Sequence, residues 1–408
     1  MKILIVNQPL RNRGDESAHK ALIRSLLNEI PEVSIRVLFV SCLSPYSISQ
    51  FSIDNKRVEY VDIHPFFRYS KISEIALIDS KKQFFWKIHP TMRQIIQHYQ
   101  WSDFVLCAPG GICMGGFQDW KHLFFLKLAK YTKKPLAYFG RSIGPFPTET
   151  ILNKKFKEIS YEMLNYFKFL SLRDKKSELI ANEIGISYIS TIDTAFLDFP
   201  NVKLPYEVDY TLKGKNYAVF VPNYLLWHYK YKGSFTIEDL IEFYSKIIHK
   251  IWSHDPNLSI VMLPQTFDQG GMLDDVNLFR MIAEYMNDPR IIVVPDCYSS
   301  DIQQTIISKA NIVIGARYHS IVFAINQNVP FIALSYEHKM IGLLETLGCS
   351  ENLIDFQETM LSYRSQEECL KKIEEMLPKL KLNPNIYDKA KLIAKQGMDR
   401  FVDMINKK

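Results

Sequence analysis

The sequence predicts an α/β fold made of two Rossmann-like, doubly wound domains that face a cleft. Short apolar runs alternate with stretches of helical spacing from the first residue onward, which is typical of parallel strands joined by crossover helices. The alternation is interrupted once, by a polar, proline-containing stretch at 198–216, and then begins again. A chain of 408 residues also exceeds what one hydrophobic core usually supports.

Each predicted domain begins with a strand and then alternates helices and strands. The first has predicted strands at 3–6, 36–40, 58–63, 104–107, 136–139 and 169–172, and helical spacing at 16–29, 120–131 and 153–166. The second has predicted strands at 217–221, 260–263, 291–294, 312–314 and 331–334, with helices near 237–252, 275–286 and 301–309. We place the domains at 1–200 and 201–380. The segment 381–408 has helical periodicity, and we expect it to cross back onto the first domain.

Composition and charge indicate an ordinary globular protein with a preference for anions. Hydrophobic residues make up 47% of the chain and charged residues 23%, a balance that supports large cores. The formal charge is +6, from 50 Lys and Arg against 44 Asp and Glu. No arginine-rich block or aromatic RNA-binding motif accompanies this mild excess. It therefore favours small anionic ligands or membrane surfaces over nucleic acid.

The cysteines and the apolar segments give no sign of a metal centre, an export signal or a membrane span. The six cysteines are scattered without a C-x-x-C pair, so we predict no metal site. Cys107 ends an apolar strand and is expected to be a buried reduced thiol. The N-terminal apolar run is too short for a signal peptide, and no segment approaches the ~20 apolar residues that span a bilayer. We expect a cytoplasmic protein.

One irregular segment, 66–101, leaves a contact with the inner face of the membrane open. It mixes aromatic residues such as Trp86 with several lysines, and a basic aromatic helix can lie on an anionic membrane. The favoured interpretation is an amphipathic helix that covers the sheet, because apolar helix faces are usually part of the core.

The most informative feature is the tripeptide Arg-Tyr-His at 317–319, followed eighteen residues later by Glu-His-Lys at 337–339. Both tripeptides follow predicted strands of one βαβ unit. A right-handed crossover places such loops side by side at the carboxyl edge of the sheet, where open α/β sheets bind ligands. Free N–H groups at the start of the intervening helix also attract anions. We expect two cations, Arg317 and Lys339, to converge with the titratable ring of His319.

Loops after strands of the first domain carry further candidates for anion binding. Gly110 and Gly111 follow the fourth strand, and paired glycines let a ligand approach backbone N–H groups. Arg141 follows the next strand and is expected to project into the cleft, where it could hold a carboxylate or phosphate in bidentate fashion. Arg173 repeats this arrangement one strand later, although a surface pair with Asp174 is equally well supported.

The turn Asn12-Arg13-Gly14-Asp15 follows the first strand and opens the first helix. Gly14 permits a tight turn, and Asp15 can cap the helix by accepting its free N–H groups. A functional role is equally supported, because the turn follows the carboxyl end of a strand and is expected to face the cleft. Asp15 could then orient a bound hydroxyl or accept its proton. The turn lacks the G-x-G-x-x-G pattern, so a dinucleotide site has little support.

Two other acidic turns follow strands and have simpler interpretations. Asp193 is expected to cap a helix. A strand of the second domain is followed by Thr266, Asp268 and the paired carboxylates of Asp274 and Asp275. They could touch an acceptor sugar, but a solvated helix start is the favoured interpretation for the paired carboxylates.

Taken in order, these motifs resemble those of the polysaccharide pyruvyltransferase family. The resemblance runs from about residue 7 to residue 348 and rests on Asn12-x-Gly14-Asp15, Pro109-Gly110-Gly111, Ser142-Ile143-Gly144-Pro145-Phe146, Arg173-Asp174, Asp193-x-Ala195-Phe196, Gly315-x-Arg317-x-His319 and Ser335-Tyr336-x-x-Lys339. It implies a GT-B-like fold. It also implies transfer of an enolpyruvyl-derived group from phosphoenolpyruvate to a sugar of a capsule, an exopolysaccharide or a lipid-linked precursor. Arg141 departs from the pattern, because many relatives carry Gln there.

The implied chemistry needs no cofactor and no metal, because phosphoenolpyruvate is itself the donor substrate. Its phosphate and carboxylate lie on one small frame and suit a cluster of cations. The candidate donor-binding residues are Arg141, Arg173, Arg317, Lys339, Gly110 and Gly111. His319 is the candidate general acid that protonates C3 of the donor. Asp15 and Glu337 are both candidates for the base that deprotonates the sugar hydroxyl.

Two other functions are compatible with the sequence. A nucleotide-sugar glycosyltransferase of the same architecture also needs a positive patch for a diphosphate, but it would require base-stacking and ribose-binding groups in the second domain. A non-catalytic carbohydrate-binding subunit would not need His319 and Lys339 beside the arginines. Several arginines around one histidine suit a compact dianion and therefore favour pyruvyl transfer.

Overall fold

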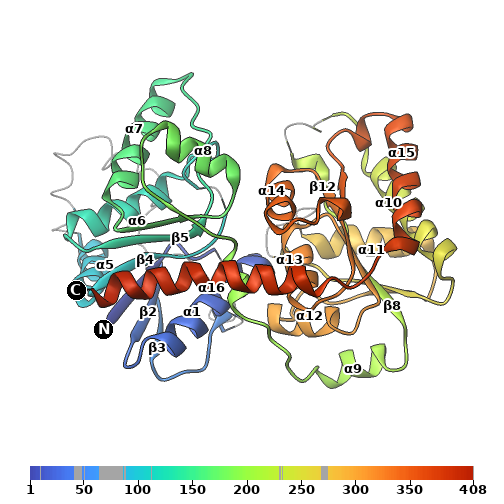
Figure 1. Ribbon diagram of the computed structural model, residues 1–408, viewed down its shortest axis with the longest axis horizontal. Coiled ribbons are helices and arrows are strands. Elements are labelled where there is room, and N and C mark those ends of the chain that lie inside the picture. The colour runs from blue at the N-terminus through green and yellow to red at the C-terminus, as the bar shows by residue number, and fades with distance from the viewer. Residues whose placement is uncertain are drawn as a thin grey trace. The chain divides into compact units, whose positions relative to one another are not determined.

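The computed structural model contains two compact units, each with its own parallel sheet (Figure 1). The structure describes residues 1–9, 11–40, 48–49, 51–63, 86, 89–111, 113–228, 231, 233–267 and 274–407. The first unit comprises Met1–Leu10, Ala18–Asp198 and Leu392–Lys408, and the second comprises Arg11–Ser17 and Phe199–Lys391. Asp268 and most of the segment predicted to contact a membrane or cover the sheet lie outside the described residues.

The sheet of the first unit has seven parallel strands in the order β3-β2-β1-β4-β5-β6-β7. The strands are β1 (Lys2–Val6), β2 (Ser34–Phe39), β3 (Val58–Asp62), β4 (Phe104–Cys107), β5 (Leu136–Arg141), β6 (Phe169–Leu172) and β7 (Ile189–Ser190). Chain progression reverses direction between β1 and β4. The carboxyl ends of these two strands therefore form the switch point at which doubly wound sheets bind ligands.

Helices cover both faces of this sheet, which is why its central strands are continuous apolar runs. One face packs against α5 (Pro90–Trp101), α6 (Trp120–Tyr131), α7 (Ile151–Tyr166) and α8 (Lys175–Glu183). Asp119, Thr150 and Asp174 start α6, α7 and α8, because each side chain accepts a backbone N–H from the first turn of its helix. The right-handed crossover from β1 to β2 places α1 (Arg13–Glu29) on the opposite face.

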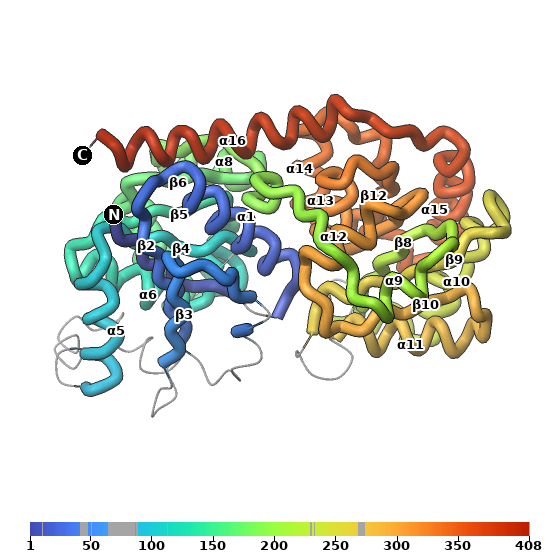
Figure 2. The backbone as a smooth tube through the Cα atoms, turned by 90° about the horizontal axis from the view of Figure 1, so that it is seen from below, coloured from blue at the N-terminus to red at the C-terminus, as the bar shows by residue number. Residues whose placement is uncertain are grey.

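The C-terminal helix α16 (Pro384–Asn406) is one continuous helix (Figure 2). Its residues up to Lys391 belong to the second unit, and those from Leu392 belong to the first. Phe401 is fully buried, and its ring contacts the rings of Phe104, Phe139 and Phe169 at centroid distances of 5.7, 5.7 and 5.1 Å. The end of α16 thus completes the core of the first unit.

The sheet of the second unit has six parallel strands in the order β10-β9-β8-β11-β12-β13. The strands are β8 (Tyr217–Val221), β9 (Ser259–Met262), β10 (Ile291–Val293), β11 (Ile312–Gly315), β12 (Phe331–Ser335) and β13 (Leu353–Asp355). Its switch point lies between β8 and β11. Two parallel, doubly wound sheets confirm the predicted α/β class, although the sequence did not predict the short edge strands β7 and β13.

The second unit contains the helices α9 (Tyr206–Leu212), α10 (Ile237–His254), α11 (Asp275–Met286), α12 (Ser300–Ile307), α13 (Tyr318–Asn326), α14 (His338–Leu347) and α15 (Tyr363–Met376). Most of them connect these strands, whereas α9 precedes the first strand and α15 follows the last. Short 3₁₀ turns occur at η2 (Thr194–Leu197) of the first unit and, in the second, at η3 (Leu225–Trp227), η5 (Ser350–Asn352), η6 (Thr359–Leu361) and η7 (Leu377–Lys379). Among the helices that the structure describes, none combines the length and apolarity needed to cross a membrane.

Candidate active site

The segment between β11 and α13 carries Arg317 and His319. β11 is fully buried between β8 and β12, and α13 begins three residues after it ends. Arg317 immediately precedes the helix, and its side chain does not cap the first N–H groups. The start of α13 therefore directs its partial positive charge toward the carboxyl edge of the sheet, where it attracts anions.

His319 packs against the backbone of Gly14. His319 is 9% exposed, and its imidazole ring meets the Tyr318 ring edge-on at 5.0 Å between centroids. A Cβ atom added to Gly14 would lie 1.8 Å from His319 Nδ1. Only glycine fits here while the ring keeps its place, so the turn at 12–15 directly contacts the predicted general acid.

Asn12 supplies a cap for the start of α1. Its side-chain oxygen accepts a hydrogen bond from the Gly14 N–H at 2.7 Å and another from the Asp15 N–H at 3.3 Å. This is the capping role that the sequence offered to Asp15. The half-buried Asp15 follows Gly14 directly, next to the contact with His319.

An interior ion pair fixes this turn within the second unit. Arg13 and Glu16 are fully buried, and their side chains pair at 2.7 Å. Arg13 lies over the Phe267 ring at 4.0 Å and donates its backbone N–H to the Gln265 carbonyl at 2.8 Å. Glu16 accepts hydrogen bonds from the backbone and side chain of Ser300. The sequence analysis did not predict this ion pair. The residues that hold it in place, Gln265, Phe267 and Ser300, lie more than 200 positions away in the chain.

The buried Asp275 holds Arg317, which overturns the interpretation of this carboxylate as part of a solvated helix start, whereas Asp274 is partly exposed where α11 begins. The Asp275 side chain is fully buried. Its carboxylate pairs with Arg317 and accepts backbone N–H groups from Gln265 at 2.9 Å and Thr266 at 3.0 Å. Burial opposes the charge on Arg317, but the attraction of Asp275 outweighs it and raises the guanidinium pKa. Arg317 is therefore a permanent cation in a fixed orientation.

The segment after β12 carries Glu337 and Lys339. β12 is paired with β11, so this segment begins at the same sheet edge as Arg317. Glu337 precedes α14 without capping it, and its carboxylate lies 2.9 Å from Lys339 Nζ. Burial alone would raise the pKa of Glu337, but the attraction and hydrogen bond of Lys339, with two nearby histidines, lower it. Glu337 is therefore ionised at neutral pH and is a weak proton acceptor.

In the first unit, Arg141 binds the glycine loop after β4. The side chain is fully buried. It donates to the carbonyls of Ala108 at 2.8 Å and Gly111 at 3.0 Å, and to the sulfurs of Cys107 at 3.4 Å and Cys113 at 3.1 Å. Donor binding by Arg141 stays a prediction. It would require the guanidinium to exchange some of these contacts for the ligand.

The side chain of Arg173 is also bound to neighbouring groups within the first unit. It forms a buried ion pair with Asp193 and donates to Ser142 Oγ at 3.3 Å. Asp174, the partner that the sequence offered for a surface pair, instead caps α8 by accepting the Ser177 N–H. Asp193 also caps η2, as predicted. A role for Arg173 in donor binding likewise stays a prediction.

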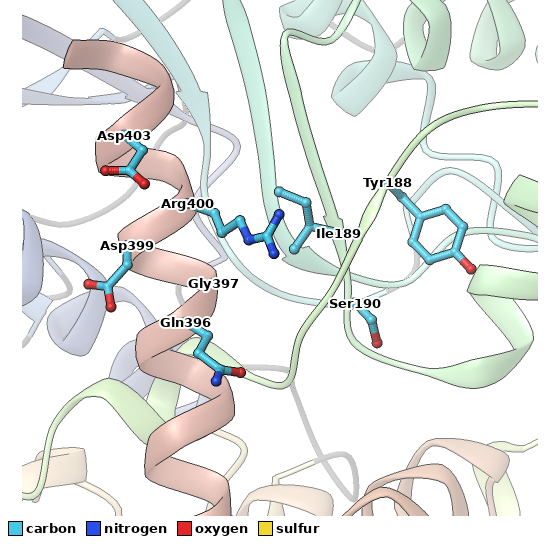
Figure 3. A pocket seen from close by; sticks show the side chains of 8 residues that line it. All are labelled: Tyr188, Ile189, Ser190, Gln396, Gly397, Asp399, Arg400 and Asp403. Atoms are coloured by element: carbon cyan, nitrogen blue, oxygen red, sulfur yellow. The ribbon is translucent and has the colours of Figure 1, made fainter. Parts of the chain in front are cut away.

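The predicted site residues thus form two sets. Those of the second unit are Asp15, Arg317, His319, Glu337 and Lys339, and those of the first unit are Gly110, Gly111, Arg141 and Arg173. A hollow of ≈ 520 Å³ in the first unit, between β7 and α16, is lined by none of them. Figure 3 shows Arg400 of α16 extending toward Ile189 of β7 in this shallow, polar hollow. We therefore do not assign the reaction to it.

The fold of this chain is similar to that of solved GT-B-like epimerases and glycosyltransferases. The structural alignment with a solved UDP-GlcNAc 2-epimerase from Methanocaldococcus jannaschii covers 100% of this chain and 100% of the epimerase, with a TM-score of 0.62 and 10% sequence identity. The UDP-GlcNAc 2-epimerase from Neisseria meningitidis, solved with bound UDP-GlcNAc, also covers 100% of both chains, with a TM-score of 0.57 and 12% identity. At such low identity the likeness shows the fold alone.

The sequence comparisons are more specific. The model of the family described as polysaccharide pyruvyl transferase matches residues 12–338. The amylovoran biosynthesis protein AmsJ of Erwinia amylovora is 24% identical over 391 residues, which cover 88% of this chain and 89% of that protein. The chain belongs to the polysaccharide pyruvyl transferase family, which confirms the resemblance of its motifs. Of the candidate site residues, Lys339 lies one position beyond the matched range.

Replacing Asp275 by Asn is expected to destabilise the protein by about 3–5 kcal/mol, because it leaves a buried guanidinium without its charged partner. The free energy of unfolding in urea measures this loss. Asp274→Asn is the matched control, because Asp274 is partly exposed and its side chain does not cap α11. Equal losses of unfolding free energy for the two variants would show that the Asp275–Arg317 ion pair does not stabilise the fold.

Proposed function

We propose that this protein transfers a pyruvyl-derived group from phosphoenolpyruvate to a sugar of a surface polysaccharide or of its lipid-linked precursor. The product is a pyruvate ketal, and phosphate is released. One arrangement carries the proposal: His319 packs on the Gly14 turn, two residues after a fixed arginine at the start of α13. Membership of the pyruvyl transferase family supports the same reaction.

Arg317 has the properties of a donor-binding residue. Asp275 and Thr266 accept hydrogen bonds from its Nη2 atom, so one side of the guanidinium is fixed. Its buried Nε atom has no acceptor among the residues that the structure describes. An unsatisfied buried donor costs about 1–3 kcal/mol. An oxygen of the phosphate or carboxylate of phosphoenolpyruvate would remove this cost and form a charge-assisted hydrogen bond.

Lys339 supplies a second positive charge that the ligand can recruit. It lies in the first turn of α14, and its ammonium group is paired with Glu337. Lysine acts as a point charge on a flexible stem, so it can turn from this carboxylate toward a bound phosphate. The starts of α13 and α14 add partial positive charge at the same edge. Together these groups stabilise the negative charge that collects on the departing phosphate.

The reaction then needs one acid and one base. His319 donates a proton to C3 of phosphoenolpyruvate, and a sugar hydroxyl adds to the electrophilic C2 while the base takes the hydroxyl proton. The C2–O bond to phosphate then breaks, and phosphate leaves with the bonding electrons. A second hydroxyl of the same sugar adds to C2, passes its proton to the imidazole of His319, which restores the general acid, and closes the ketal.

We assign the base to Asp15. Glu337, the other candidate, is paired with Lys339, and its lowered pKa makes it a weak base. Asp15 is half-buried and directly follows the glycine that contacts His319. In this proposal Glu337 orients the ammonium group of Lys339, and Asp15 orients and deprotonates the acceptor hydroxyl.

The reaction is tested by incubating the purified protein with phosphoenolpyruvate and a panel of synthetic and lipid-linked sugars. We expect release of inorganic phosphate that depends on the acceptor, with a matching pyruvate mass gain on the sugar by mass spectrometry. His319→Asn should lower kcat by about 10²–10⁴-fold, the usual contribution of a general acid. Release of a nucleoside diphosphate from added nucleotide sugars, with no phosphate release from phosphoenolpyruvate, would indicate a glycosyltransferase. Sugar binding without turnover would indicate a non-catalytic subunit.

The position of His319 is tested by Gly14→Ala. The added methyl group must displace the imidazole, so kcat should fall by about 10²-fold, as for other small misplacements of a reacting group. Gly116→Ala is the matched control, because a Cβ atom there meets nothing within 4 Å. Full activity of Gly14→Ala, with folding intact by circular dichroism, would contradict the placement of His319.

The choice of base is tested by comparing Asp15→Asn with Glu337→Gln. We expect Asp15→Asn to lower kcat by about 10²–10⁴-fold. Glu337→Gln should act mainly on KM for phosphoenolpyruvate, because it releases Lys339 from its partner. The reverse pattern would transfer the role of base to Glu337.

A further inference from the structure

A cluster of metal-ligating side chains lies at the carboxyl end of β4, in the first unit. Cys113, Asp119 and His122 each offer one ligand atom, and these atoms lie within 4.8 Å of one another. The sequence predicted no metal site, because it lacks a C-x-x-C pair. We propose that the first unit binds one Zn²⁺ ion through Cys113, Asp119 and His122, with Cys107 as the fourth ligand.

Cys107 is suited to the fourth position. It is the last residue of β4 and is fully buried, and its sulfur lies 3.8 Å from His122 Nε2. A sulfur and a nitrogen bound to the same tetrahedral zinc ion are separated by roughly 3.5 Å, given the usual Zn–S and Zn–N bond lengths. Cys107 lies outside the set of three residues whose ligand atoms are all within 4.8 Å of one another, so its sulfur must also move toward Cys113 and Asp119 to complete the site.

Three structural elements present the ligands. Cys107 ends a central strand, Cys113 belongs to the glycine loop, and Asp119 and His122 stand at the start of α6. The Asp119 side chain accepts the His122 backbone N–H at 2.9 Å, which fixes these two residues relative to each other. Zinc would therefore tie the loop that contains Gly111 to the sheet and to the helix that follows.

Arg141 gives independent support. Its guanidinium donates to the sulfurs of both cysteines and to the carbonyl groups of Ala108 and Gly111. No carboxylate among the described residues pairs with it. A buried cation without an anionic partner is costly. Thiolates of a zinc site would supply the missing negative charge, and hydrogen bonds from neighbouring groups to ligand atoms are usual around bound metals.

Charge balance favours four protein ligands over three. Metal binding removes the thiol protons, so Cys107, Cys113 and Asp119 contribute three negative charges against the two positive charges of zinc. With a neutral imidazole, the site carries one net negative charge, which Arg141 cancels. A protonated Cys107 would leave a net positive charge at the buried guanidinium of Arg141. Two thiolates, an imidazole and a carboxylate suit Zn²⁺ better than Mg²⁺ or Ca²⁺.

Four protein ligands make a closed site, which is typical of structural zinc. The ion would stabilise the glycine loop without taking part in the transfer reaction, because a closed site leaves no position for substrate. The inference is therefore independent of the proposed function. A negative result for zinc would not count against the proposed reaction, and a negative activity test would not count against the metal site.

The test uses the full chain, purified after growth with added zinc and dialysed against metal-free buffer. We expect about one zinc ion per chain by inductively coupled plasma mass spectrometry, as for a closed structural site. Replacement by Co²⁺ should give thiolate-to-cobalt charge-transfer absorption and the intense visible bands of a tetrahedral site. A wild-type protein that holds no zinc and gives no such absorption would overturn the proposal.

Three variants locate the site. Cys113→Ser should lose the zinc and the cobalt charge-transfer intensity contributed by its thiolate. Asp119→Asn keeps the α6 cap, since Asn caps as well as Asp, and should weaken zinc binding by at least ~10-fold. Cys297→Ser, at an exposed cysteine of the second unit, should bind zinc like the wild type. Full occupancy in Cys113→Ser, or equal losses in Cys113→Ser and Cys297→Ser, would overturn the assignment.

Discussion

One buried carboxylate, that of Asp275, organises the candidate active site. It binds the backbone after β9 through Gln265 and Thr266, and it holds the guanidinium of Arg317 after β11. The carbonyl of Gln265 in turn receives the backbone N–H of Arg13, which anchors the turn that touches His319. A buried charge is stable only with its partners in place, so these contacts depend on one another.

The site combines a fixed cation with a movable one. Arg317 cannot turn, because Asp275 and Thr266 hold its Nη2 atom. Lys339 is paired with a partly buried glutamate and has a flexible stem. This division suits the proposed reaction, in which a small anionic donor first binds in one orientation and then loses its phosphate. Catalysis of this kind depends on charge placed in advance where negative charge will develop.

Arginines that follow strands have different roles in the two units. Arg141 is the last residue of β5, and Arg317 lies two residues beyond the end of β11. Arg141 bonds to carbonyls and thiols of the loop beside it, whereas Arg317 pairs with a carboxylate. Arg173 pairs with Asp193 inside the first unit. Position after a strand therefore does not by itself make an arginine a ligand-binding residue. The neighbouring groups decide whether its donors are used within the protein.

The sequence by itself determined the α/β class, the order of the central strands and the helices between them, and the placement of Arg317, His319 and Lys339 after two neighbouring strands. These features follow from local periodicity and from the fixed hand of βαβ crossovers. Only the tertiary structure decided which groups meet: Asp275 with Arg317, Gly14 with His319, Asp193 with Arg173, and Cys113 with His122. The physical reason is that such partners are selected by burial and by distance through space. Residues far apart in the chain leave no local signal of the contact that they will make.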